Sequence, residues 1–417
     1  MKILIVSQYF WPESFIINDL VATLRRQGHE LMVLTGKPNY PDGRIADGYT
    51  RAGVQREDYA GVEVVRVPLR PRGNGSSREL ILNYLSFVWS GLRYFLPLTR
   101  GRHFDAILVF APSPITAAIP AIPLKWAGKG HLAIWIQDLW PESLSATGFV
   151  RRPWLLGVAG LMVRAIYACT DTLLIQSQAF RGPVARYAAE EKIAYYPNSM
   201  RAAPQADDQG ADLPAELVDL LKRHFCIVFA GNIGTAQAVE TIVDAAARLR
   251  DLPHCKIVLI GGGSMLSWVQ ERKAALALDQ LVLPGRFPMS AMPQVYRLAA
   301  GLLVTLKDEE IFSYTVPSKV QAYLAAGKPI VAALNGEGAR IVRESGAGLT
   351  CPAEDAAALA AQIRALYAMS ADDRARMGAA GHRYFLEHFE MGRQAQYLVG
   401  LLERRIVSAK GNSRCVS

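Results

Sequence analysis

Short apolar runs alternate with stretches of helical periodicity along most of the chain. Residues 2–7 form an apolar strand pattern, residues 15–27 repeat apolar side chains at helical spacing, and residues 29–35 form a second strand pattern. Further strands of the first half are expected at residues 106–110, 131–137, 172–176 and 194–197. This alternation predicts a Rossmann-like α/β domain over residues 1–200, with ligands at the carboxyl ends of its parallel strands.

The same alternation returns in the second half, after a polar stretch at residues 201–214. That stretch contains proline, glycine and several charged residues, a composition typical of a linker. Strands are then expected at residues 226–230, 256–260, 281–283, 302–306 and 330–333. The pattern predicts a second α/β domain over residues 215–387, followed by a helical segment at residues 388–417.

The stretch from Ser313 to Gly336 is the candidate ligand site of the second half. Pro317 suits the start of a helix, Ser318 is a candidate cap, and Gly327 is expected to end the helix before a buried strand. The N-terminus of a helix carries partial positive charge and free N–H groups, and Lys319 adds a full positive charge there. Phosphate or diphosphate is the expected ligand, and the alternative is a surface lysine on an ordinary helix.

Two glycine-rich turns follow strands of the same domain. Gly231-Asn232-Ile233-Gly234 and Gly261-Gly262-Gly263-Ser264 are each expected to open a helix. Glycine lets a ligand approach the backbone, and N–H groups at such a turn favour an anion. Either turn alone can merely connect strand to helix, but together with the helix of Lys319 they predict an anion site at one edge of the sheet.

Composition narrows the class of protein. The 417 residues are 51% hydrophobic and 20% charged, which is typical of a folded chain of two or three domains. The five cysteines are scattered without metal or redox spacing, so a reducing cytosol is expected, and no signal peptide is expected because the chain opens on a strand pattern. No zinc-finger, RNP-type or helix-turn-helix pattern favours nucleic acid.

Positive charge is concentrated in the first half, where residues 1–200 carry seven of the nine net positive charges. Part of it flanks the apolar run at residues 80–98, which reads as a helix with a narrow polar stripe. Such a helix is either buried in the protein or lies in a membrane interface, where the flanking cations favour anionic headgroups. Its polar side chains argue against a spanning helix. The flanking cations are Arg66, Arg70, Arg72, Arg78, Arg100 and Arg102. The apolar helix at residues 154–169, by contrast, is expected to be core.

Residues 317–334, PSKVQAYLAAGKPIVAAL, resemble the GT-B glycosyltransferases of glycosyltransferase family 4. Residues 25–41, RRQGHELMVLTGKPNYP, match the same family, and the resemblance covers nearly the whole chain. Within the family, the first segment looks most like bacterial surface-polysaccharide enzymes that transfer N-acetyl-L-fucosamine or a related sugar. The resemblance implies a GT-B fold, in which two Rossmann-like domains face a cleft and the C-terminal helix at 388–417 crosses back to the first domain.

The resemblance also implies where the substrates lie. A UDP-sugar would bind to the second domain, and a polyprenyl-diphosphate-linked saccharide would bind to the first as acceptor. No Asp-x-Asp pair stands at a strand end, so no catalytic metal or other cofactor is expected. Asp138 and Glu142 follow a predicted strand, which puts them at a ligand-facing edge. The expected catalytic residues are Asp138, Glu142 and Lys319. The expected acceptor-binding residues are Glu13, Ser14, Phe15, Asn39 and Tyr40. The expected nucleotide-sugar residues are Gly231, Asn232, Gly234, Gln237, Gly262, Gly263, Arg286, Pro288, Pro317, Ser318 and Gln321.

The sequence departs from the family pattern at several positions. Asn232 and Gln237 stand where the family has an Arg and a Lys that grip the diphosphate, so Lys319 and Arg286 become the main cations available to it. Tyr314 and Ala322 replace the two family glutamates, which puts the contact to the ribose in doubt. Candidate substitutes for that contact are Gln321 and Glu337. The first domain also has Pro12-Glu13-Ser14 where the family usually has glycines.

These expectations point to a transferase of surface-polysaccharide synthesis, such as that of O-antigen or capsule. It would move an N-acetylated 6-deoxyhexosamine, such as N-acetyl-L-fucosamine, from UDP to a lipid-linked saccharide. The enzyme is expected to be cytoplasmic and peripheral on the inner face of the cytoplasmic membrane, in contact with its anionic surface and not with nucleic acid. Two alternatives stay open: a UDP-sugar 2-epimerase of the same fold, and an inactive protein that only binds nucleotide-sugars.

Overall fold

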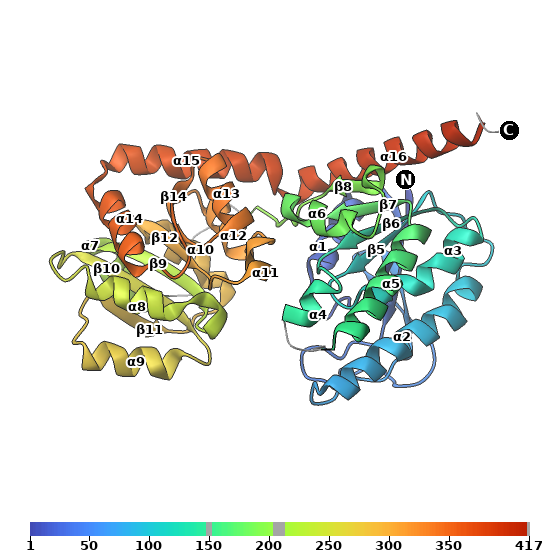
Figure 1. Ribbon diagram of the computed structural model, residues 1–417, viewed down its shortest axis with the longest axis horizontal. Helices are drawn as coiled ribbons and strands as arrows, with labels where there is room; N and C mark the ends of the chain where they lie inside the picture. The colour runs from blue at the N-terminus through green and yellow to red at the C-terminus, as the bar shows by residue number, and fades with distance from the viewer. Residues whose placement is uncertain (147–151, 203–212, 415–417) are drawn as a thin grey trace. The chain divides into compact units, whose positions relative to one another are not determined.

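The computed structural model describes residues 1–146, 152–202 and 213–414. The chain forms two compact units: unit 1 comprises Met1–Ser199 and Met391–Ser417, and unit 2 comprises Met200–Glu390 (Figure 1). The predicted linker at 201–214 lies mostly outside the described residues. Each unit is a parallel α/β sheet covered by helices, so the predicted pair of Rossmann-like domains is confirmed.

Unit 1 is built on an eight-stranded sheet in the order β3-β4-β2-β1-β5-β6-β7-β8. All neighbours run parallel except β3 and β4. Apolar runs had marked six of the strands, whereas β3 and β4 form a hairpin that the sequence analysis did not predict. The strands are β1 Lys2–Ser7, β2 Glu30–Gly36, β3 Gln55–Tyr59, β4 Val62–Val67, β5 Ala106–Ala111, β6 His131–Ile136, β7 Thr172–Ile175 and β8 Ile193–Tyr195.

The helices of unit 1 lie on both faces of this sheet. Right-handed crossovers place the helix after β1 on one face and the helices after β4, β5 and β6 on the other, because the chain crosses the sheet in opposite directions. In Figure 1, α16 runs along the top of the unit and α2 along the bottom, with strands between them. The helices are α1 Ile16–Arg26, α2 Ser77–Leu98, η1 Ile115–Ala121, α3 Ile122–Trp126, α4 Glu142–Ala146, α5 Pro153–Cys169, η2 Gln178–Phe180, α6 Arg181–Ala185, η3 Glu190–Lys192 and α16 Met391–Arg414.

The C-terminal helix α16 belongs to unit 1. It contacts α1, and its Leu398 and Leu402 are fully buried in the same core as Leu20 and Leu24 of that helix. The crossing-back helix expected from the GT-B resemblance is therefore present.

Helices α2 and α5 each bury one side and expose the other. The α2 helix begins at a cap in which the Ser76 side chain accepts from the Glu79 N–H, and it buries Phe87 and Phe95 against η1. The α5 helix was expected to be core, and that prediction is wrong: Trp154 and Leu161 are among its exposed residues. One stripe of α5 is enough to cover the sheet, so the opposite stripe stays apolar but exposed.

Unit 2 has a six-stranded parallel sheet in the order β11-β10-β9-β12-β13-β14. Its strands are β9 Phe225–Asn232, β10 Cys255–Gly262, β11 Leu281–Gly285, β12 Gly301–Thr305, β13 Ile330–Ala333 and β14 Gly348–Cys351. Its helices are α7 Ala215–Arg223, η4 Thr235–Gln237, α8 Val239–Ala247, α9 Leu266–Ala275, η5 Met289–Ala291, α10 Met292–Leu298, α11 Glu310–Ser313, α12 Ser318–Ala326, α13 Gly336–Glu344, α14 Ala356–Ala368 and α15 Ala371–His388.

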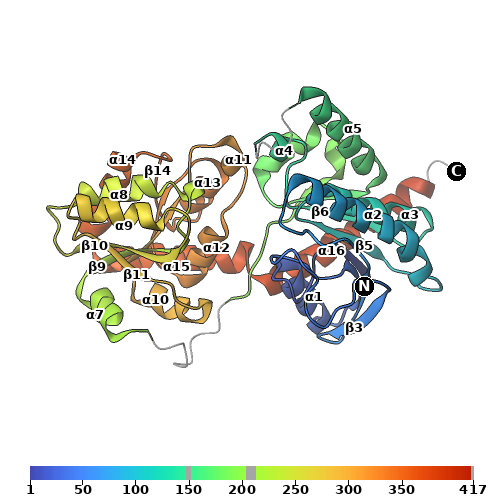
Figure 2. The same ribbon diagram turned by 90° about the horizontal axis from the view of Figure 1, so that it is seen from below.

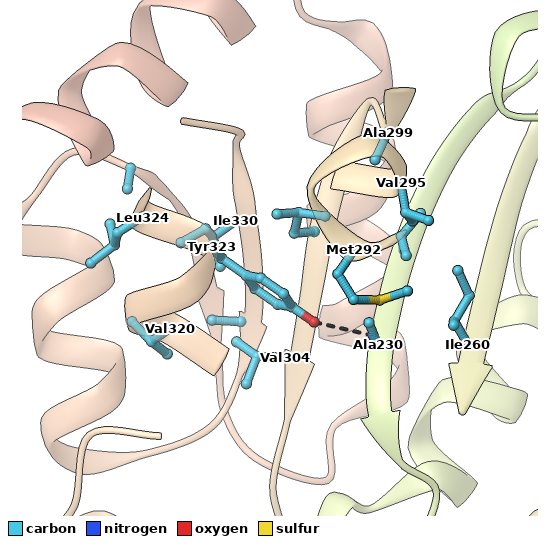
Figure 3. Close-up of a cluster of buried hydrophobic side chains, with 14 of the residues drawn as sticks. Ala230, Ile260, Met292, Val295, Ala299, Val304, Val320, Tyr323, Leu324 and Ile330 are labelled. Atoms are coloured by element: carbon cyan, nitrogen blue, oxygen red, sulfur yellow. Dashed lines mark hydrogen bonds between the residues drawn. The ribbon is translucent and has the colours of Figure 1, made fainter. Parts of the chain in front are cut away.

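One core cluster of unit 2 fixes α12 against the sheet (Figure 3). Tyr323 is fully buried in it, and its hydroxyl accepts a hydrogen bond of 3.2 Å from the N–H of Ala230. A buried hydroxyl without a partner is costly, so this bond favours one position of the helix. Consequently the first turn of α12 lies beside the carboxyl end of β9.

Two local predictions for unit 2 need correction. The glycine turns do not open helices directly, because β9 extends through Asn232 and β10 through Gly262. Ser318 is the first residue of α12 and not its cap; Pro317 holds the cap position, and no side chain caps the first turn. Proline has no N–H and fits before a helix, so Ser318 is free to begin it. No helix in the described parts of the chain is long and apolar enough to cross a membrane.

Candidate active site

A pocket of about 510 Å³ lies in unit 2 at the carboxyl ends of β9, β10 and β11. The first turn of α12 closes one side of it, and the segment around η5 and α10 closes another. This edge is where parallel α/β sheets bind ligands. The lining residues are Met200, Ala230, Gly231, Asn232, Ile260, Gly261, Gly262, Arg286, Phe287, Met289, Met292, Tyr296, Ser318, Lys319 and Ala322.

Glycine is required where β9 and β10 meet this pocket. Gly231 and Gly261 have φ of +135° and +146°, a region that side chains disfavour. A Cβ at Gly261 would lie 1.8 Å from the Gly231 carbonyl oxygen, and one at Gly231 would lie 2.7 Å from Cε of Lys319. The backbone is therefore bare at the point that the lysine approaches.

Lys319 is the main charge of the pocket. Its Nζ lies 3.6 Å from the centre of the Phe229 ring, a cation–π distance. Burial lowers the pKa of Lys319 to about 8 from its ordinary 10.5, because desolvation disfavours the charged form. Among the described residues no carboxylate forms an ion pair with it. A partly buried cation without a counter-ion favours an anionic ligand.

Arg286 supplies a second cation from the segment after β11. Its side chain lies over the β10 edge, where a Cβ at Gly262 would come within 3.0 Å of Cδ. No ion pair joins Arg286 to a carboxylate of the described residues either. The pocket thus joins two cations, bare strand ends and the uncapped start of a helix, which together suit a diphosphate.

The structure brings together some of the predicted nucleotide-sugar residues and not others. Gly231, Asn232, Gly262, Arg286 and Ser318 line the pocket beside Lys319. The remaining ones lie outside its lining: Gly234, Gln237, Gly263, Pro288, Pro317 and Gln321.

Three of these non-lining residues support the Asn232 side chain or the local backbone. Gln237 accepts from Nδ2 of Asn232 at 3.2 Å, and a Cβ at Gly234 or Gly263 would collide with the Asn232 amide. Gln321 is buried within α12, and Pro288 is the cap of η5.

The predicted catalytic residue Asp138 lies in unit 1, two residues after β6. The side chains of Ser113, Ser143 and Trp140 lie beside its carboxylate, and Nε1 of Trp140 donates to Oγ of Ser113 at 3.4 Å. Burial raises the pKa of Asp138, and the neighbouring polar side chains oppose the rise. This carboxylate therefore lies at the carboxyl edge of the sheet, among polar side chains.

Glu142 begins α4, a few residues beyond Asp138. One of its carboxylate oxygens lies 3.6 Å from Nη1 of Arg186, and the other has no hydrogen-bond partner among the described atoms. That second oxygen is buried, so this structure does not present it to a ligand.

The predicted acceptor residues fall into two groups. Glu13 is buried, and its oxygens accept from the N–H groups of Phe10, Asn39 and Tyr40. Burial raises its pKa and these bonds oppose the rise. Glu13 therefore ties two loops together, and buried Asn39 extends the tie by accepting from the Arg72 N–H.

The second group faces outward. Ser14 is exposed, and the rings of Phe15 and Tyr40 lie 5.5 Å apart with Tyr9 against both. Arg72 lies over the rings of Tyr9 and Tyr40 and donates to the Tyr9 hydroxyl at 2.6 Å. Sequence reasoning had placed Arg72 among the membrane-facing cations; instead it belongs to this aromatic cluster.

Arg66 and Arg102 are likewise corrected as membrane-facing cations. Arg66 is fully buried and forms an ion pair with Glu57, and Arg102 pairs with Glu63. The hairpin β3–β4 supplies both glutamates, and its strands had not been foreseen.

No group of three or more His, Cys, Asp or Glu side chains suited to a metal ion occurs among the described residues. The expectation of a metal-independent reaction stays a prediction.

Two family models match complementary parts of the chain. One, described as a glycosyl transferase 4-like domain, matches residues 15–199, and the other, described as glycosyl transferases group 1, matches residues 224–369. Together they cover the strands of both sheets except β1, one model for each unit.

The chain belongs to the GT-B glycosyltransferases. Two relatives with glycosyltransferase names support this assignment. The putative colanic acid biosynthesis glycosyl transferase WcaI of Escherichia coli K12 is 26% identical over 342 residues, 78% of this chain and 82% of WcaI. The probable glycosyltransferase WbjE of Pseudomonas aeruginosa is 25% identical over 318 residues, 70% of this chain and 73% of WbjE.

Solved structures confirm the fold of the glycosyltransferase. HepE of Anabaena in complex with UDP has a TM-score of 0.65 at 13% identity and covers 97% of this chain and 100% of its own. An E. coli trehalose-6-phosphate structure bound with UDP-2-fluoro glucose has a TM-score of 0.69 at 14% identity and covers 96% and 99%.

Proposed function

We propose that this glycosyltransferase moves an N-acetylated 6-deoxyhexosamine from a UDP-sugar to a lipid-linked saccharide in the synthesis of a bacterial surface polysaccharide. The names of WcaI and WbjE support the glycosyl transfer, and that of WcaI supports a surface polysaccharide. The resemblance of residues 317–334 to N-acetyl-L-fucosamine transferases supports the sugar. The complexes of HepE and its neighbours with UDP or UDP-sugars support the donor.

The unpaired Lys319 beside the bare ends of β9 and β10 is the observation that carries the proposal. When the bond between the anomeric carbon and the diphosphate oxygen breaks, its electron pair stays on the departing UDP. Lys319 and Arg286 then stabilise the added negative charge, which is electrostatic preorganisation. A hydroxyl of the acceptor forms the new bond to the anomeric carbon and gives up its proton, and Asp138 is the proposed residue nearest that hydroxyl.

The contact to the ribose differs from the family pattern in this proposal. Ala322 lines the pocket but has no polar group, and Tyr314 lies outside the lining and bonds to Glu310. The suggested substitute Glu337 is buried, and its carboxylate accepts from Nε and Nη2 of Arg340, so it is not available to the ribose. Asn232 lines the pocket with an amide that can bond a hydroxyl, and we assign it the ribose contact in place of a glutamate.

Release of UDP by the purified protein tests this function. UDP-N-acetyl-L-fucosamine and UDP-N-acetylglucosamine are supplied with and without a polyprenyl-diphosphate-linked saccharide. The proposal predicts UDP release that needs the acceptor and prefers the 6-deoxy sugar. Isomerisation of the sugar without an acceptor would identify the 2-epimerase, and UDP binding without any release would identify an inactive binder.

A further inference from the structure

The outer side of the helical layer α2–α3–α5 exposes an unusual amount of apolar surface. On α2, residues 81, 85, 89, 92 and 96 are large, apolar and exposed, and their spacing places them on one side of the helix. The stripe is about 22 Å long, at 1.5 Å per residue. Trp89, in its centre, is 71% exposed.

A second apolar stripe lies on α5. Trp154, Val158 and Leu161 follow one another at helical spacing, and Leu161 is 68% exposed. Trp126, at the end of α3, is 72% exposed. The α2 and α5 helices both contact η1 and lie on the same face of the sheet (Figures 1 and 2). We therefore assign the two stripes to one surface. We call these nine side chains, together with Leu155, the apolar face.

Cations without carboxylate partners border the apolar face. Arg51 and Arg70 line a pocket of about 350 Å³ together with Trp89, Ser86 and Ser90. Neither arginine forms an ion pair among the described residues. Exposed Arg78 and Arg152 stand near the starts of α2 and α5. Guanidinium groups beside a tryptophan and two hydroxyls offer donors to a phosphate group.

We propose that the apolar face lies in the interface of an anionic phospholipid bilayer, with a lipid phosphate between Arg51 and Arg70. Three tryptophans on one surface fit the depth at which indole rings lie in membranes, part apolar and part hydrated. Helices that lie in the interface bury an apolar stripe and keep cations at the headgroups. A second copy of the chain fits less well, because a two-fold contact would bring these arginines together. This inference rests on the proposed lipid-linked acceptor only for its purpose, not for its observations.

The test measures binding of the full-length protein to vesicles by sedimentation, without donor or acceptor. Vesicles consist of phosphatidylcholine alone or of a mixture with phosphatidylglycerol. The wild type is expected to sediment with the mixed vesicles and much less with the neutral ones. Trp89→Glu and Leu161→Glu, on the two helices, are each expected to lower binding about tenfold, since each buries a charge in the acyl boundary. Arg51→Gln and Arg70→Gln should each lower binding to the mixed vesicles about fivefold, as expected for one cation at an anionic surface.

Val407→Glu is the matched control. Val407 is 70% exposed but lies on α16, across the sheet from the apolar face, so this variant should bind like the wild type. The inference would be overturned if the wild-type protein did not bind to mixed vesicles. Unchanged binding of Trp89→Glu or of Leu161→Glu would overturn it as well. Self-association that Trp89→Glu abolishes, without vesicle binding, would identify a dimer surface instead. Because the vesicles contain no substrate, a failed transfer assay would reject the proposed function alone.

Discussion

At the scale of single residues, the pocket of unit 2 is defined by charge that no carboxylate of the described residues neutralises. Lys319 is partly buried against Phe229, and its lowered pKa of about 8 shows that burial costs the protonated form free energy. An anion that binds in the pocket stabilises the protonated lysine and so offsets that cost. The cost in the empty protein is consistent with a residue selected for ligand binding and not for stability.

Replacing Lys319 by Met should lower turnover more than it lowers stability. A charge-assisted hydrogen bond contributes about 1.5–3 kcal/mol, which corresponds to about 10- to 100-fold in rate. The lysine stabilises the departing diphosphate more than the bound donor, so the loss should appear in kcat at saturating UDP-sugar. Lys328→Met, at the other end of α12 and outside the pocket lining, is the matched control and should keep normal turnover. Normal kcat for Lys319→Met would show that the diphosphate is neutralised elsewhere.

The lowered pKa predicts how UDP binding depends on pH. In the proposed function Lys319 binds the diphosphate in its protonated form, and in the free protein this form declines above pH 8. UDP affinity should therefore be full near neutral pH and about tenfold weaker at pH 9. In Lys319→Met this loss should be absent. Titration calorimetry with UDP at several pH values measures it, and a parallel decline in both proteins would assign the titration to another group.

The same shift fixes the sign of the effect on folding. A lysine whose pKa is about 8 in the folded chain and 10.5 otherwise binds fewer protons when folded. Its contribution to stability therefore rises with pH between these values and is unfavourable below them. Lys319→Met removes the unfavourable contribution, so its melting temperature at neutral pH should not fall below that of the wild type.

Asp138→Asn should separate the two substrates. The Asp138 carboxylate lies beside Ser113, Ser143 and Trp140 in unit 1, whereas the pocket of Lys319 lies in unit 2. The variant is expected to bind UDP normally and to lose most of its transfer, by about 100-fold, if a carboxylate acts on the acceptor hydroxyl. Calorimetry with UDP, thermal melting and the transfer rate are measured together. Full transfer would reject the role, and a lowered melting temperature would show that Asp138 is structural.

At the scale of elements, the ends of β9 and β10 form a rigid edge that only glycine permits. Gly261→Ala would bring a methyl group to within 1.8 Å of the Gly231 carbonyl, in a backbone region that alanine avoids. The strands must separate to accept it, which moves the edge away from Lys319. UDP affinity should fall at least tenfold, and kcat should fall as well. Gly101→Ala also replaces a glycine of positive φ, but nothing lies near its Cβ, so it should leave UDP binding unchanged.

How far the elements could be predicted depends on how their side chains are buried. Parallel strands buried on both faces are continuous apolar runs, which is why the patterns at 2–7 and 330–333 marked β1 and β13. The edge strand β3, QREDY, is half exposed and mostly polar, so no apolar run marked it. Helix α5 is as apolar as a core helix, and composition alone could not show that one of its sides faces outward.

The site shows the same division. Lys319 could be predicted as a site residue because Pro317 and Gly327 mark the two ends of its helix in the sequence and because the segment resembles a known family. Tyr296 and Phe287 line the pocket without any local pattern, since their positions depend on how α10 and β11 fold back to the strand ends. The bidentate hold of Arg340 on Glu337 was equally invisible, because a carboxylate looks alike in the sequence whether it is free or paired.

At the scale of the whole molecule, the chain passes from unit 1 to unit 2 and returns. It leaves unit 1 after Ser199 and re-enters it at Met391. Near the junctions, the backbone N–H of Met200 donates to the carbonyl of Phe389, so the outgoing and returning strands of the chain are paired within unit 2. Consequently the folding of unit 1 requires a segment that follows all of unit 2 in the sequence.

Deleting the residues after Glu390 should therefore destabilise the part of the protein that lies farthest from the cut in sequence. The α16 helix covers α1 with Ala395, Leu398 and Leu402, which are fully buried. Their loss exposes the buried apolar side chains of α1. Each fully buried leucine contributes about 1.5–3 kcal/mol to the free energy of unfolding. The truncated chain should lose the cooperative melting of unit 1. Exposure of Trp135, which is buried in the core of unit 1, reports that melting.

The unit 2 pocket is the internal control for this truncation. Its lining residues lie between Met200 and Ala322, and α15 remains in the shortened chain, so calorimetry should still detect UDP binding. Leu398→Asp in the full-length chain tests the same contact without changing the length, and it should lower the melting of unit 1 in the same way. If truncated and full-length proteins melt alike, α16 contributes no stability to unit 1. If UDP binding disappears together with unit 1, the two units depend on each other for folding, as the joint loss of both halves would require.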